Sequence, residues 1–112
     1  MRRLIFLAAA LALLAGPLSL SARAGDESLE QALVESATTP QQHAALANYY
    51  TAKAAAARKE AESHRSMAKA YGGVKGSQIA AMKEHCEKLA TLSDDEAKEF
   101  DALASMHKDM AK

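Results

Sequence analysis

The 112-residue chain has no tryptophan, one cysteine, two prolines and five aromatic residues. A single cysteine excludes a framework of intramolecular disulfides, and the absence of a Cys-x-x-Cys-His motif excludes covalent attachment of c-type haem. There is no glycine-rich phosphate-binding loop and no alternating strand pattern. The cysteine and a histidine could form a nucleophile and its base. The two-helix hairpin predicted below, however, offers no substrate cleft and no oxyanion donors. We therefore expect no enzymatic activity.

Residues 1–24 have the pattern of a cleaved secretory signal peptide. Two arginines at positions 2 and 3 precede an apolar run over residues 4–14, which is too short to span a bilayer, and Ala-Arg-Ala at 22–24 fits a cleavage site. We therefore expect a mature chain that begins at Gly25, is periplasmic or secreted, and has no stable insertion in a membrane after cleavage.

Large apolar side chains are scarce after this segment. Residues 25–112 hold ten Leu, Ile, Val and Phe in total against twenty Ala, which favours helix but buries little area. The same residues carry 11 basic and 14 acidic side chains, so no basic face is expected and nucleic acid is not an expected partner. A chain with so little to bury is predicted to need a second copy or a metal ion for stability.

Two long helices are predicted within residues 39–112. Thr39 followed by proline and Gln42 has the pattern of an N-cap with a capping box, and two glycines at 72–73 are typical of a helix end. Ser77 is the expected cap of the second helix. The predicted helices cover about 40–71 and 78–111, with residues 25–38 as a polar N-terminal arm or short helix.

A seven-residue repeat of apolar and small side chains runs through both predicted helices and is typical of coiled-coil-like packing. The fold class is therefore predicted as all-α, an antiparallel helical hairpin that dimerises into a four-helix bundle. With the turn centred near residues 74–75, residues whose numbers add up to about 149 should face each other. Tyr50 is expected opposite Phe100.

The same register gathers all four histidines into two layers between the helices. The first layer would place His64 opposite His85, next to Cys86, with Met67 opposite Met82. The second would place His43 opposite Met106 and His107. Neutral imidazole with soft sulfur suits Cu(I) best, and Zn(II) is also compatible with a His/Cys set. No paired carboxylates of the two-metal type are present.

The sequence thus predicts an exported metal-binding protein for copper or zinc buffering, delivery or sensing, with a metal-handling partner protein. Two alternatives stay open. One is a metal-free periplasmic helical-bundle protein with an interaction or structural role. The other is non-covalent b-type haem binding by paired hairpins. Cys86 could also remain free or form a disulfide between two copies.

Overall fold

The computed structural model describes the backbone of residues 19–112. It describes the exposure and contacts of side chains from residue 26 onward. It contains three helices, α1 (Ser19–Ser36), α2 (Pro40–Gly72) and α3 (Ser77–Met110). Residues 1–18 of the predicted signal peptide lie outside the described residues. The chain divides between residues 32 and 33 into two compact units. The second unit contains all of α2 and α3.

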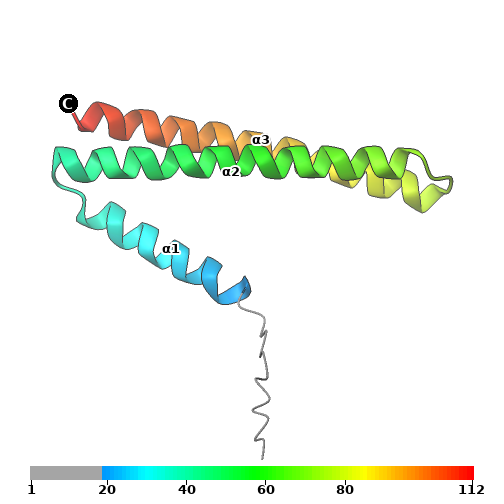
Figure 1. Cartoon of the computed structure of the whole chain (residues 1–112), viewed down its shortest axis with the longest axis horizontal. Coiled ribbons are helices and arrows are strands. Elements are labelled where there is room, and N and C mark those ends of the chain that lie inside the picture. The colour runs from blue at the N-terminus through cyan, green and yellow to red at the C-terminus, as the bar shows by residue number, and fades with distance from the viewer. Residues whose placement is uncertain (1–18) are drawn as a thin grey trace, which may run out of the picture. The chain divides into compact units, whose positions relative to one another are not determined.

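Helices α2 and α3 pack side by side as an antiparallel hairpin (Figure 1). The turn joins them at one end, and the C-terminus lies beside the start of α2 at the other end. This confirms the all-α class and the predicted hairpin. No helix in the described part of the chain is both long and apolar enough to span a membrane.

The start of α2 is fixed by the predicted cap. The side-chain oxygen of Thr39 accepts a hydrogen bond from the backbone N–H of Gln42, whose own side chain accepts from the backbone N–H of Thr39. These two bonds satisfy backbone donors that the first helical turn leaves without partners. Pro40 occupies the first helical position, where a missing N–H costs nothing.

The start of α3 differs from the prediction. Gly76, and not Ser77, is the N-cap residue, and no side chain caps this end. Gly76 has φ of 141°, a conformation that a residue with a Cβ rarely adopts. The pattern of residue types therefore placed the boundary one residue late, because a glycine turn replaces the side-chain cap.

Small side chains fill the contact between α2 and α3. Most of the buried side chains are alanines, at positions 47, 54, 57, 61, 68, 90, 97 and 104. Leu46 and Tyr50 are the large buried side chains of the described residues, and Phe100 and Leu103 pack against them. The rings of Tyr50 and Phe100 stack at 6.1 Å, as the register predicts.

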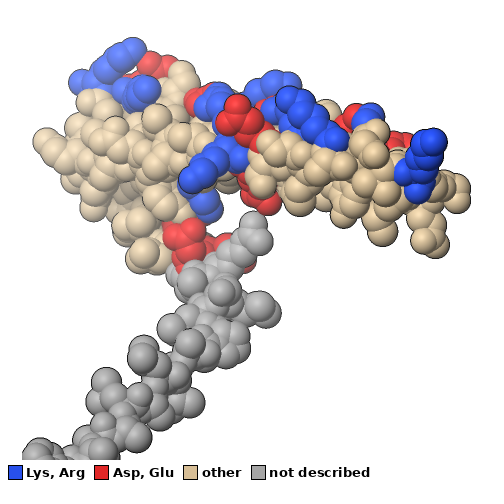
Figure 2. Space-filling model, turned by 45° about the vertical axis from the view of Figure 1, so that its right-hand side comes forward, with Lys and Arg blue, Asp and Glu red and all other residues tan. Residues whose placement is uncertain are grey.

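Charged side chains of both signs are interleaved over the hairpin (Figure 2). Two ion pairs join the helices, Arg58 with Asp101 and Arg65 with Asp94, one heptad apart on each helix. Exposed pairs of this kind contribute little to stability, up to about 1 kcal/mol each. Their seven-residue spacing does show that one register is kept along the middle of the hairpin.

Candidate metal centre

His43 and His107 meet between the helices at the end of the hairpin opposite the turn. Their Nδ1 atoms are 3.0 Å apart, and their rings stack with centroids 5.2 Å apart. His43 lies in the first turn of α2 and His107 in the last turn of α3, so the antiparallel arrangement itself brings them together. This is the pairing that the register predicts for the second histidine layer.

Aromatic packing holds the His107 ring in place. The Tyr50 ring, one heptad along α2 from His43, stacks on the His107 ring with centroids 5.6 Å apart and planes 12° apart. Burial, and then the neighbouring His43, lower the pKa of His107 below its usual value. His107 is therefore neutral at physiological pH, which is the form of imidazole that binds a metal ion.

Tyr50 also belongs to this site, although the sequence pattern predicted it only as a core residue opposite Phe100. Its position seven residues after His43 is the signal that could have placed it beside the histidine pair. Residues one heptad apart lie on the same helix face, so a ring at position 50 follows His43 along the contact with α3.

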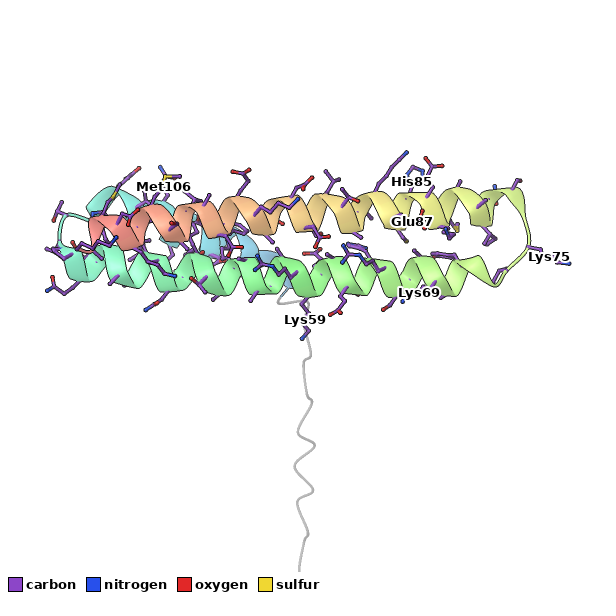
Figure 3. All side chains as sticks on the ribbon, turned by 90° about the horizontal axis from the view of Figure 1, so that it is seen from above. Lys59, Lys69, Lys75, His85, Glu87 and Met106 are labelled. Carbon is purple, nitrogen blue, oxygen red and sulfur yellow. The ribbon has the colours of Figure 1, made fainter. Side chains whose placement is uncertain are left out.

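Met106 does not join the histidine pair. Its side chain is 53% exposed and projects from the outer side of α3, away from α2 (Figure 3). Adjacent residues on a helix point about 100° apart, so only one of Met106 and His107 can face α2.

In the first predicted layer, Cys86 and His64 lie at the contact between the helices. Cys86 is buried as a free thiol, with 9% exposure. His64 is mostly buried, and its Nδ1 atom is fully buried without a hydrogen-bond partner among the described residues. Its other nitrogen, Nε2, lies 3.8 Å from a carboxylate oxygen of Glu60, one turn earlier on α2. The i, i+4 spacing of Glu60 and His64 is a signal for this contact that the sequence already contains.

The structure does not bring the other members of this layer to the contact. His85 is exposed and lies on the outer side of α3, away from α2 (Figure 3). Met67 and Met82 are 41% and 45% exposed. Cys86, and not His85, therefore takes the inward position of the predicted layer.

No group of three or more His, Cys, Asp and Glu side chains in the described part of the chain could hold a metal ion. Each layer instead offers a pair of donors, one from each helix. Comparisons of the chain with family models, with curated proteins and with solved structures find no match. The geometry of these side chains is therefore the basis on which a function can be proposed.

Proposed function

We propose that this chain is an exported metal-binding protein that holds a copper or zinc ion with His43 and His107. The observation that carries the proposal is the 3.0 Å separation of the two Nδ1 atoms, which come from opposite ends of the hairpin sequence. Two nitrogens each bound at about 2.0–2.1 Å to one tetrahedral ion are roughly 3.3 Å apart. The two Nδ1 atoms already lie close to this separation, and both rings would turn so that their lone pairs meet at one ion.

The surroundings of the pair favour metal binding over a purely structural contact. Without a metal, one neutral ring must donate its Nδ1–H to the other ring. With a metal, both Nδ1 atoms act as ligands and neither keeps a proton. Stacking on Tyr50 limits the orientations of His107, so less ring freedom is lost when the ion binds.

Two protein ligands leave other coordination positions of the ion open. An ion held in this way exchanges its remaining ligands readily, which fits buffering, sensing or delivery to a metal-handling partner better than permanent structural binding. Imidazole donors suit both copper and zinc, so the histidine pair by itself is compatible with either ion.

Metal titration of variants tests this proposal. The protein is purified from the periplasm, stripped with a chelator, and titrated with Zn(II) and Cu(II) by calorimetry. We expect one ion per chain at this pair, and we expect His43→Gln and His107→Gln each to abolish that binding event. His85→Gln is the matched control, because it removes an exposed histidine that lies outside the pair.

Circular dichroism confirms that each variant is folded. A double substitution of His43 and His107 that leaves the number of Zn(II) and Cu(II) ions bound per chain unchanged contradicts the proposal. The absence of any binding by the unmodified protein contradicts it equally.

A metal-free helical-bundle protein is the second candidate, and exposed apolar side chains on the hairpin favour it. Most of these side chains lie on α3, namely Met82, Leu89, Leu92, Met106 and Met110, and Met67 on α2 and Val74 in the turn are exposed as well. Such a surface fits packing against other helices. This candidate predicts that the hairpin associates with other helices equally strongly before and after the chelator treatment. A metal-binding protein, in contrast, changes its folding stability when the metal is removed.

Haem b is the remaining alternative from the sequence. The His43 and His107 nitrogens are too close for an iron ion to sit between them as opposed axial ligands. The arrangement that the sequence suggests instead takes one histidine, His64 or His85, from each of two paired hairpins. A Soret band after addition of haem to the purified protein would support this alternative, and its absence would remove it.

A further inference from the structure

We infer that His64 and Cys86 form a second metal site that takes a soft monovalent ion, Cu(I), between α2 and α3. This site has different donors from the histidine pair and rests on separate observations, so it does not depend on the proposed function. It would sit about 32 Å from the first site, since 21 residues of α2 separate His43 from His64.

The register of the hairpin places both donors at the helix contact. His43 contacts His107, and Tyr50 contacts Phe100 seven residues further along. Two more heptads along α2 lead to His64, and two more heptads back along α3 lead to Cys86. Both of these residues lie at the helix contact, as the register requires: Cys86 is buried and the His64 side chain is 16% exposed.

The buried nitrogen of His64 is suited to act as a ligand. Buried polar atoms without a hydrogen-bond partner are uncommon in folded proteins, and binding of an ion can satisfy such an atom. The Nδ1 atom of His64 is one of them, whereas Nε2 faces the carboxylate of Glu60. At 3.8 Å this carboxylate is beyond hydrogen-bond distance, but its charge favours a proton on Nε2 and leaves the lone pair on Nδ1, the arrangement that a hydrogen-bonded carboxylate gives in many metal-bound histidines.

The chemistry of the two donors selects the ion. A thiolate and an imidazole nitrogen are soft enough to select Cu(I), and this ion accepts as few as two ligands. Binding is a ligand exchange without electron transfer: the Cys86 thiol loses its proton to solvent, and Cu(I) forms bonds to Sγ and to Nδ1. Buried alanines at 61, 68 and 90 lie within one helical turn of His64 or Cys86, so the neighbouring positions at the helix contact are apolar.

Competition for Cu(I) tests the site. The protein is titrated anaerobically against a chromogenic Cu(I) chelator, with the ion supplied in its reduced form. We expect Cys86→Ser and His64→Gln each to weaken Cu(I) binding by more than about 100-fold, and Glu60→Ala to weaken it by about 10-fold, because a carboxylate that orients a ligand contributes on this scale.

Two control variants separate this site from its neighbours. Ser93→Ala changes a buried side chain one heptad after Cys86, and His85→Gln removes the exposed histidine next to it. Both should bind Cu(I) like the unmodified protein. Thermal unfolding identifies any variant that fails to fold. If Cys86→Ser does not fold, Cys86→Ala is used in its place.

Unchanged Cu(I) affinity in folded Cys86→Ser overturns the inference. Loss in Cys86→Ser with full affinity in His64→Gln overturns it too, because the thiolate would then bind without the imidazole. The double substitution of His43 and His107 leaves this Cu(I) site in place, so failure of the first site and failure of the second are distinguishable.

Discussion

Single residues decide which histidines of this chain can act as ligands. His107 is partly buried against Tyr50 and lies within hydrogen-bond distance of His43. Both burial and the nearby ring disfavour the imidazolium form. The hairpin therefore presents His107 as a neutral donor directly beside His43.

The lowered pKa of His107 predicts that the hairpin is less stable in acid. The unfolded chain binds a proton near pH 6.5, whereas the folded chain binds it only at a lower pH. The contribution of His107 to the free energy of unfolding is therefore fully present above about pH 6.5 and falls as the pH drops toward the lowered value. Thermal unfolding of stripped protein between about pH 7.5 and 5 measures this fall.

His107→Gln should flatten this pH dependence, because the titrating ring is gone. His85→Gln, which changes an exposed ring on the outer side of α3, should keep the wild-type slope. Equal slopes for His107→Gln and the unmodified protein would show that other groups cause the acid sensitivity.

The sequence predicted the site only to within one residue in the alignment of α2 with α3. His43 with His107 and Tyr50 with Phe100 followed from folding the sequence about the turn. Whether His85 or Cys86 points inward did not follow, because neighbouring residues on a helix differ by about 100° in direction. The observed pairs add up to 150 in residue number, one more than expected, and this single step favours Cys86.

At the scale of helices, the boundaries were predictable where side chains set them. The capping box at Thr39 fixes the start of α2, and both long helices match their predicted ranges to within one residue at each end. The boundary at Gly76 was missed because backbone conformation, and not a capping side chain, starts α3. Helix α1 begins at Ser19, before the predicted arm at 25–38, and continues through Gly25 to Ser36.

The turn gives a prediction about stability. Gly76→Ala places a Cβ at φ of 141°, which should destabilise the hairpin by about 1–2 kcal/mol. Gly73→Ala is the matched control, because Gly73 has φ of −88° and its added Cβ would meet no atom closer than 4.0 Å. Urea unfolding followed by circular dichroism measures both. Equal stability of the two variants would contradict the role of Gly76.

The hairpin as a whole buries little apolar area along much of its length. Beyond Leu46 and Tyr50, its buried side chains are alanines, Cys86 and Ser93. Alanines let α2 and α3 approach closely and keep one register, but each contributes little burial. Larger side chains on α3, such as Leu89, instead remain exposed. This distribution is why we propose that two hairpins associate into a four-helix bundle.

Sedimentation velocity across the micromolar range tests the dimer, and Leu92→Lys should weaken it. Leu92 is 63% exposed, so its replacement costs the isolated hairpin little, whereas a lysine buried between two hairpins would need to lose its hydration. Thr91→Lys adds the same charge at a neighbouring exposed position and should leave the dimer intact. A stable, folded monomer of the unmodified protein would mean that the alanine contact alone is sufficient, and would exclude the four-helix bundle.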